Sequence, residues 1–489
     1  MASANNYSRI LAGLLTIGVS ATLFWFGNGL NPVWPFMWLA PMPVLVFALR
    51  NSARAAAVIA FFSIWLGCLN LWNYLRILGA PPAVWLIIFT IAAVVFVGAV
   101  LLFRGLVLRG AVWSALVSFP SAWVVYEFVR NLTSSGGTAG SFAYSQLGFL
   151  PFLQLASLTG AWGVTFFLLL FSAALAIGWH LHSTAPKKAE QIMIAGLGSV
   201  ALVLIFGVMR LATPLHGTAV RVGLVASDAQ KNLFVASPGA ATGRLFRDYS
   251  AAAGMLAREG AQVIVLPEKL GTNEGRGTTT TDEIFQSLAD KTGATIVVGM
   301  ADVAPPVQYN QARVYAPGTS TLLYDKQHML PPMESMFTPG TTLTLLPRPS
   351  GIWGVAICKD MDFASPSRLY GKAGVGLLLD PGWDFNIDRG WHGHIAIMRG
   401  VESGFSIAHA AKNGYLTVSD NRGRILAETG SDSAPFATLV AQVPVAHAHT
   451  LYLLWGDWFA WLSLAMLVAA LIQLIRLRAE TIRDRKSVV

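Results

Sequence analysis

The chain has 489 residues, of which 54% are hydrophobic and only 12% are charged, and its mean hydropathy is +0.55. A soluble protein cannot bury so much apolar surface, so this composition excludes an ordinary water-soluble protein and indicates a membrane protein. The formal net charge is +9. Most of the basic residues that produce it fall in short segments between apolar runs, so we do not expect nucleic-acid binding.

The apolar residues are concentrated in two blocks. Residues 10–211 and 451–475 are nearly continuous apolar runs, whereas residues 218–445 have the composition of a soluble α/β protein. This pattern predicts three regions: a bundle of seven transmembrane helices at 1–215, an α/β domain at 216–450, and a last transmembrane helix with a basic tail at 451–489.

Transmembrane spans are predicted from length, because a bilayer core of about 30 Å needs roughly 20 apolar residues per helix. No small-residue cleavage site follows the first run, so we interpret it as a helix and not as a signal peptide. The criterion predicts eight spans, near 10–27, 33–49, 55–75, 84–103, 111–130, 153–179, 192–210 and 456–475.

The distribution of Arg and Lys predicts the orientation, because short cytoplasmic loops retain positive charge. With the N-terminus inside, the outer face receives only Arg76, Arg130 and Arg210. The α/β domain then lies outside the cytoplasm, in the periplasm or its equivalent. The residues placed inside are Arg9, Arg50, Arg54, Arg104, Arg109, Lys187, Lys188, Arg476, Arg478, Arg483, Arg485 and Lys486.

Only two cysteines occur, Cys68 in the third predicted span and Cys358 in the α/β domain. A disulfide between a membrane-buried residue and the outer domain is not expected, so the chain has no disulfide framework. A lone thiol in an oxidising compartment is a liability unless it is used, which makes Cys358 a candidate for chemistry.

Strand-like runs alternate with helical segments through the α/β domain, which predicts a mixed sheet covered by helices. The helical segments are 244–258, 282–292, 366–373 and 391–403. The predicted strands are 220–226, 262–267, 295–302, 311–317, 320–325, 354–358, 374–380, 405–411 and 415–419.

Three residues at predicted strand ends carry reactive groups. Glu268 follows Val-Ile-Val-Leu-Pro, Lys326 ends Thr-Leu-Leu-Tyr-Asp-Lys, and Cys358 ends Gly-Val-Ala-Ile-Cys. Taken singly, a cysteine there is usually a small buried hydrophobe, and Glu and Lys are usually solvated surface charges. Together they supply a nucleophile, a base and a cation for an oxyanion, as chemistry on an ester or amide carbonyl requires.

The order of these residues resembles the nitrilase, or carbon–nitrogen hydrolase, superfamily, in its membrane branch, the apolipoprotein N-acyltransferases. That resemblance implies an αββα sandwich with a Glu-Lys-Cys triad at Glu268, Lys326 and Cys358. The matching strings are Leu266-Pro267-Glu268, Tyr309-Asn310-Gln311-Ala312, Tyr324-Asp325-Lys326-Gln327-His328, Ile357-Cys358-Lys359-Asp360, Met398-Arg399-Gly400-Val401-Glu402 and Lys412-Asn413-Gly414.

The apolar part resembles the same branch, which soluble nitrilases do not explain. The similar segments keep the order of the family, so the resemblance covers almost the whole chain. They are Ala122 to Arg130 in the fifth span, Tyr144-Ser145-Gln146, Leu155-Ala156-Ser157, Gly160 through Gly163, and Trp455-Gly456-Asp457-Trp458 before the last helix.

Four positions depart from the family pattern. Ser134 to Ser141 replaces a Gly-Phe-Pro-Trp stretch, and Lys269 follows the first glutamate. Pro331-Pro332-Met333-Glu334 stands where the family has Pro-Phe-Gly-Glu, and Lys359-Asp360 stands where it has Tyr-Glu after the cysteine. The triad survives these changes, whereas substrate detail is open.

The resemblance implies a ping-pong acyl transfer. Glu268 would take the proton of Cys358, and the thiolate would attack the sn-1 ester of a phospholipid and release a lysophospholipid. Lys326 and a backbone N–H near Lys359 would hold the oxyanion. The thioester would then acylate the α-amino group of a diacylglyceryl-cysteine on an apolipoprotein, without a cofactor or nucleotide. The implied location is a bacterial inner membrane with the catalytic domain in the periplasm.

Further site residues are suggested beside the triad. Glu334 matches a second family glutamate that supports the lysine, although it could be a surface carboxylate. Asp360 replaces the glutamate after the nucleophile, or else caps a helix. The apolar segment 328–345 has no regular periodicity and suggests a lid or a membrane-dipping arm, or a buried loop. The residues proposed to contact substrate are Met333 and Phe337 in this segment, Trp383 and, in the fifth span, Glu127, with Arg130 as the partner of Glu127.

His392 with His394 and His447 with His449 have no Cys or carboxylate at ligand spacing, so no metal site is predicted. Two alternative functions are considered beside acyl transfer. A membrane-anchored amidase would resolve the thioester with water instead of an amine. A non-catalytic scaffold would have no need of an intact Glu, Lys and Cys. The oligomeric state does not follow from the sequence.

Overall fold

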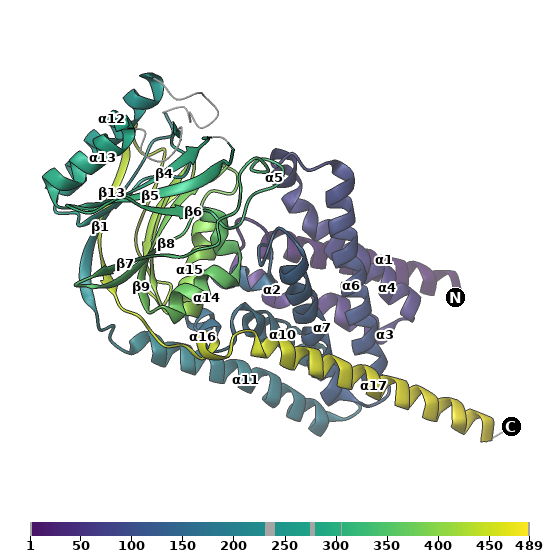
Figure 1. Ribbon diagram of the computed structural model, residues 1–489. Coiled ribbons are helices and arrows are strands. Elements are labelled where there is room, and N and C mark those ends of the chain that lie inside the picture. Colours follow the sequence, from purple (N-terminus) through teal and green to yellow (C-terminus); the bar gives the residue numbers. More distant parts are fainter. Residues whose placement is uncertain (1, 230–239, 274–278, 305, 488–489) are drawn as a thin grey trace. The chain divides into compact units, whose positions relative to one another are not determined.

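The computed structural model describes residues 2–229, 240–273, 279–304 and 306–487 (Figure 1). The chain divides into two compact units. The first, the bundle unit, comprises Met1–Leu132, Gly140–Arg210 and Asp457–Val489, and the second, the sheet unit, comprises Thr133–Ala139 and Leu211–Gly456.

Among the described residues, seven helices of the bundle unit are long and apolar enough to cross a membrane. In these helices nonpolar side chains face outward as well as inward, as lipid-facing helices require. They are α1 (Ala2–Gly27), α4 (Ala53–Cys68) continuing through η1 (Leu69–Leu71) and α5 (Trp72–Ile77), α6 (Pro82–Val107), α7 (Val112–Thr133), α10 (Ala161–Leu181), α11 (Pro186–Ala212) and α17 (Trp458–Ser487).

The predicted span at 33–49 is not one continuous helix. It forms two short helices, α2 (Trp34–Leu39) and α3 (Met42–Arg50), because Pro41 and Pro43 have no N–H to continue the hydrogen-bond ladder. Likewise, the span predicted from 153 begins only at Ala161, after α8 (Leu150–Leu153), α9 (Ala156–Thr159) and a positive φ at Gly160.

The broken segment nevertheless crosses the bundle. Gly13 of α1 lies against Ile59 of α4, and Phe24 of α1 lies against Gly67 of α4, so α1 and α4 run in the same direction. The chain between them must therefore return through the thickness of the bundle, and Trp34–Arg50 is the segment that does so. In the described part of the chain, seven long helices and this broken segment are therefore eight candidate membrane crossings.

The sheet unit contains two sheets. In the first, the strand order is β13-β1-β2-β4-β5-β6, with β3 paired to β4; in the second it is β12-β11-β10-β9-β8-β7. The first sheet comprises β1 (Thr218–Ala226), β2 (Val263–Val265), β3 (Thr272–Asn273), β4 (Thr295–Asp302), β5 (Tyr309–Tyr315), β6 (Leu322–Asp325) and β13 (Ala437–Val445). The second comprises β7 (Thr344–Arg348), β8 (Gly351–Val355), β9 (Val375–Trp383), β10 (Ser406–Lys412), β11 (Tyr415–Ser419) and β12 (Ile425–Gly430).

The two sheets face each other across a shared apolar core, to which β1 contributes Val222 and Leu224 and β9 contributes Leu377 and Leu379. On its other face the first sheet packs against α12 (Ala240–Arg258) and α13 (Thr279–Thr292). The second sheet packs against α14 (Ala364–Lys372) and α15 (Trp391–Ser403). Figure 1 shows these helices on opposite sides of the paired sheets. The expected αββα sandwich is confirmed, as two facing sheets rather than one mixed sheet.

Candidate active site

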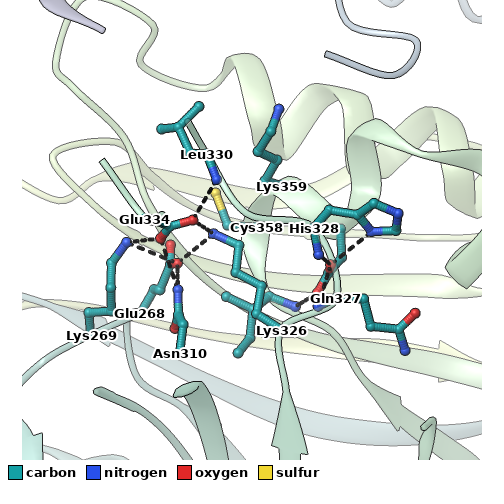
Figure 2. A network of polar contacts seen from close by, with 12 residues as sticks. Glu268, Lys269, Asn310, Lys326, Gln327, His328, Leu330, Glu334, Cys358 and Lys359 are labelled. Carbon is teal, nitrogen blue, oxygen red and sulfur yellow. Dashed lines mark hydrogen bonds and ion pairs between the residues drawn. The ribbon is translucent and has the colours of Figure 1, made fainter. Parts of the chain in front are cut away.

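The three reactive residues come from the ends of strands in both sheets. Glu268 follows β2 by three residues, Lys326 directly follows β6, and Cys358 opens the 3-10 turn η3 (Cys358–Asp362) after β8. The backbone N–H of Glu268 donates to the carbonyl of Gly382 in β9, at 3.2 Å, which ties the first sheet to the second at this point. All three side chains point into one buried cluster (Figure 2).

Lys326 lies between two carboxylates. Its Nζ is 2.8 Å from Oε1 of Glu268 and 2.8 Å from Oε2 of Glu334, and all three side chains are buried. The side-chain amide of Asn310 donates to Glu268 Oε1 and, at 2.9 Å, to Glu334 Oε1. Glu334 Oε2 also accepts the backbone N–H of Leu330, at 2.9 Å, so this carboxylate fixes both the lysine and its own loop.

A second lysine, Lys269, completes the cluster; it was predicted only as a departure from the family pattern. Lys269 Nζ lies 3.3 Å from Glu268 Oε1 and forms a close ion pair with Glu334. The same Nζ is 5.1 Å from the ring centroid of Trp383, the last residue of β9. Its position directly after Glu268 in the sequence is the signal that could have identified Lys269. In the structure this position brings its side chain into the same buried space.

Cys358 sits on a sharp turn with φ of +44°, in the left-handed region that residues other than glycine adopt at a cost. Its N–H donates to Asp380 Oδ1 at 2.6 Å, and Asp380 Oδ2 is 2.8 Å from His409 Nδ1. This buried Asp–His pair, which was not predicted from the sequence, fixes the turn through the N–H of Cys358. Figure 2 shows the sulfur beside the amine of Lys326.

The electrostatics of the cluster favour a protonated thiol at rest. Burial raises the pKa of Cys358 well above its usual value, and the charge of Glu268 raises it further against the opposing effect of Lys326. Burial by itself would lower the pKa of Lys326, but Glu268 and Glu334 raise it well above the usual range. Burial would raise the pKa of Glu334, yet Lys326 and Lys269 hold it well below its usual value. Cys358 therefore needs a base before it can react.

Asp360 lies beside the cysteine turn without joining the lysine–carboxylate cluster. Its Oδ1 accepts the backbone N–H groups of Gln327, at 3.0 Å, and His328, at 2.8 Å. Its Oδ2 accepts the Tyr324 hydroxyl at 2.8 Å and the backbone N–H of Ile357 at 3.2 Å. Asp360 thus joins the segment that carries Lys326 to the turn that carries Cys358, and it does not cap α14.

The neighbouring Lys359 is also turned away from the thiol. Its Nζ is 3.1 Å from Asp362 Oδ2, and it lies over the ring of Phe363 at 5.7 Å from the centroid. The side chain of Lys359 therefore contributes its charge to an ion pair within η3. Its backbone N–H directly follows Cys358 in the turn.

The predicted substrate contacts take different places. Trp383 borders the cluster through Lys269, as described above. On the loop after Lys326, Met333 and Met336 are 40% and 55% exposed, whereas Phe337 is buried. The segment 328–345 has no helix in the structure, and β7 begins near its end at Thr344. It therefore presents two methionines to the surface above a buried anchor.

Glu127 belongs to the bundle unit, where its carboxylate has a full set of donors. It accepts the Trp123 indole N–H at 3.0 Å, the backbone N–H of Phe142 at 2.8 Å, and the hydroxyls of Ser141 at 2.7 Å and Thr165 at 2.9 Å. The charge of Arg130 also acts on it, as expected from their spacing. These contacts indicate that Glu127 organises the bundle.

Among the described residues, one group has the arrangement of metal ligands: Asp384, Asp388 and His392, all buried. Carboxylates therefore do approach His392, contrary to the sequence-based argument. The ring is instead occupied by ion pairs, with Nδ1 3.1 Å from Asp362 and Nε2 3.7 Å from Asp388. Burial would lower the pKa of His392, but these carboxylates raise it to about 9. The ion pairs of His392 with the surrounding carboxylates account for the closeness of these side chains.

Comparisons with known proteins cover most of the chain. Residues 20–174 match the family described as apolipoprotein N-acyltransferase N-terminal domain, and residues 228–450 match the carbon-nitrogen hydrolase family. An apolipoprotein N-acyltransferase of Gloeobacter violaceus is 28% identical, with 89% of each chain covered. Another, of Geobacter metallireducens, is 26% identical over 73% of this chain and 74% of that protein. Among solved structures, an amidase from Nesterenkonia sp. matches 47% of this chain and 93% of its own at 20% identity, with a TM-score of 0.40.

Proposed function

Since the chain belongs to the apolipoprotein N-acyltransferase family of the nitrilase superfamily, we propose that its acyl transfer proceeds through a thioester on Cys358. N-acyltransferase activity follows from the family, and hydrolysis of an amide is not favoured, because the relatives that match along most of the chain are acyltransferases. The observation that carries the proposal is the buried contact of Lys326 with Glu268 and Glu334 beside the only cysteine of the sheet unit.

Glu268 is the base in this proposal. Lys326, Lys269 and Asn310 all approach its Oε1, which leaves Oε2 to accept the thiol proton of Cys358. The thiolate attacks the ester carbonyl of a membrane phospholipid, and a C–S bond forms as the carbonyl oxygen becomes an oxyanion. The C–O bond then breaks, and the leaving lysophospholipid alkoxide takes the proton back from Glu268.

Lys326 and a backbone amide stabilise the oxyanion. The N–H of Cys358 is committed to Asp380, so it is the N–H of Lys359 that is left in the turn to donate. With Lys326 Nζ on the other side, the oxyanion receives one charged and one neutral donor. Loss of one such donor costs about 10²–10³ in kcat in other enzymes that use oxyanion holes.

In the second half-reaction the acceptor is the α-amino group of a diacylglyceryl-cysteine at a lipoprotein N-terminus. Glu268 takes a proton from the amine as nitrogen attacks the thioester carbonyl, and an amide bond forms. The C–S bond breaks, and the departing thiolate takes that proton from Glu268, which regenerates the Cys358 thiol and the Glu268 carboxylate. A thioester is reactive enough toward amines that no nucleotide is needed, which suits a site outside the cytoplasm.

The chain is a multi-pass membrane protein, and we propose that the sheet unit faces the periplasm of a bacterial inner membrane. The eight candidate crossings support this side. Seven precede the sheet unit and one follows it, so a basic tail in the cytoplasm places the sheet unit outside. Both substrates are lipids, so the exposed Met333 and Met336 are suited to dip into the bilayer surface and guide acyl chains toward Trp383.

The test is transfer of a labelled acyl chain. The purified protein is incubated with phospholipid labelled in the sn-1 chain and a diacylated lipopeptide with a free amine. The proposal predicts label in the lipopeptide, dependence on Cys358, and none in an N-acetylated control peptide. Label appearing only as free fatty acid would mean that water is the acceptor and would replace the proposal with hydrolysis.

A further inference from the structure

Four charged side chains form a closed ring at the site. Glu268 contacts Lys326 and Lys269, and Glu334 contacts the same two lysines, so the charges alternate around the ring. All four residues are buried, with at most 6% of any one exposed. Two positive and two negative charges balance, so the ring buries no net charge, and removal of any one member leaves an uncompensated buried charge.

From this geometry we propose that Lys269 is a positioning residue that fixes the Glu268 and Glu334 carboxylates and balances the charge of the ring beside the Cys358 thiol. The inference rests on the proposed role of Glu268 as the base. Lys269 acts through its ion pairs with Glu268 and Glu334.

The backbone conformation of Lys269 is fixed by its neighbours. Its φ is +48°, a conformation that a residue with a side chain adopts only where the surroundings impose it. On one side Glu268 N–H bonds to Gly382, and on the other Leu270 N–H bonds to Gly299 at 2.9 Å. The left-handed turn between these anchors directs the lysine back toward the glutamate that precedes it, and the Trp383 ring covers its amine.

The charge balance fixes the sign of the effect. Without Lys269 the ring would hold two carboxylates and one amine, and its net charge of −1 would disfavour a thiolate on Cys358. Nearby negative charge raises the pKa of this thiol and nearby positive charge lowers it, so removal of Lys269 should raise the pH at which Cys358 ionises. The other titratable groups facing the thiol are Asp380 and Asp384 of β9 and the loop after it, and they are unchanged by this substitution.

The test measures thiol reactivity without any lipid. The rate of iodoacetamide alkylation at Cys358 is followed against pH by peptide mass, which separates it from Cys68. Lys269→Met is expected to move the midpoint of the rise upward by about one pH unit, a tenfold loss of rate below the midpoint. Lys269→Arg, which keeps the charge, is expected to stay near the unsubstituted protein.

A second variant tests charge balance itself. Glu334→Gln makes the ring net positive and is expected to lower the midpoint, and the double variant Lys269→Met/Glu334→Gln is expected to return it toward the original value. A midpoint unmoved by Lys269→Met, or a shift that persists in the double variant, would overturn the inference. If Lys269→Met fails to fold, the direction of the Glu334→Gln shift still decides.

The proposed base is separated from this inference by one control. Glu268→Gln removes the carboxylate, so acyl transfer to the lipopeptide should be lost, whereas iodoacetamide should still alkylate Cys358. If acyl transfer survives in Glu268→Gln, the proposed function loses its base. If transfer is lost there but the alkylation midpoint ignores Lys269→Met, only the role of Lys269 is lost.

Discussion

Replacing Lys326 with methionine removes the cation that two buried carboxylates share while keeping a side chain of similar length. Glu268 and Glu334 each lose a contact of 2.8 Å and are left with Lys269 as their lysine. Breaking a buried ion pair from one side typically costs about 3–5 kcal/mol of stability. Loss of an oxyanion donor costs about 10²–10³ in kcat.

These two costs appear in different measurements. Thermal unfolding of the purified protein in detergent should show a lower Tm for Lys326→Met, and the release of lysophospholipid should fall by about 10²–10³ at temperatures where the protein is still folded. Lys326→Arg keeps the positive charge, so it should recover most of the Tm, but its longer planar group cannot place a donor at the same point, and its rate should stay low.

Either of two results would contradict these roles of Lys326. A near-normal rate in folded Lys326→Met would remove this residue from oxyanion stabilisation. A Tm unchanged by Lys326→Met would mean that the carboxylates do not depend on it, and the ionic cluster would have to be reinterpreted.

Three further predictions concern other parts of the chain. Asp360→Ala should lower the rate and the Tm together, and Asp360→Glu should restore little, because four donors converge on the shorter carboxylate; rates equal to the unsubstituted protein would exclude the positioning role. His392 has its pKa raised to about 9, so its contribution to stability is complete below about pH 6.5 and is lost as pH rises through 9; His392→Gln should remove that part of the Tm decrease, and an identical pH dependence would contradict the ion pair. A cysteine introduced at Lys187 should resist a membrane-impermeant thiol reagent in intact cells, whereas one at Ser350 should react; the same labelling at both positions would contradict the proposed topology.

The fold could be predicted largely because the membrane helices and the α/β domain occupy separate regions of the chain, each with its own pattern of apolar residues. Apolar runs of about 20 residues mark membrane helices, and alternation of Val-rich strands with amphipathic helices marks the α/β domain. The nine predicted strands are all present, with ends shifted by a few residues. Hydropathy could not reveal the break in Trp34–Arg50, because proline is itself compatible with an apolar run and only its missing N–H interrupts the helix.

The strands that were missed have physical reasons. β7 contains Pro347 and β13 contains Pro444, and both are edge strands, where a missing N–H is tolerated but the sequence pattern is weakened. β12 is an edge strand of mixed polarity, and β3 has only two residues. None of these produces a local period strong enough to be recognised.

The triad could be predicted because its three residue types supply the three different groups that acyl transfer requires. A lone cysteine, with a glutamate and a lysine at strand ends, indicated the cluster, and the order along the chain indicated which residues meet. Lys269 and the Asp380–His409 pair were not predicted, because charged and polar residues are usually solvated and only tertiary packing buries these three. Asp360 was predicted near the nucleophile. Its role in joining the segments that carry Lys326 and Cys358 could not be predicted, because it depends on how these segments are arranged in three dimensions.

The most direct test of the account is the intact mass of the protein after incubation with phospholipid alone. The account predicts an increase of one acyl chain, located on Cys358, accompanied by release of lysophospholipid. The adduct should be removed by neutral hydroxylamine, as thioesters are, and by a diacylated lipopeptide with a free amine, and Cys358→Ala should form none. Absence of any adduct in the unsubstituted protein, under conditions where the lipopeptide is still acylated, would contradict a thioester on Cys358.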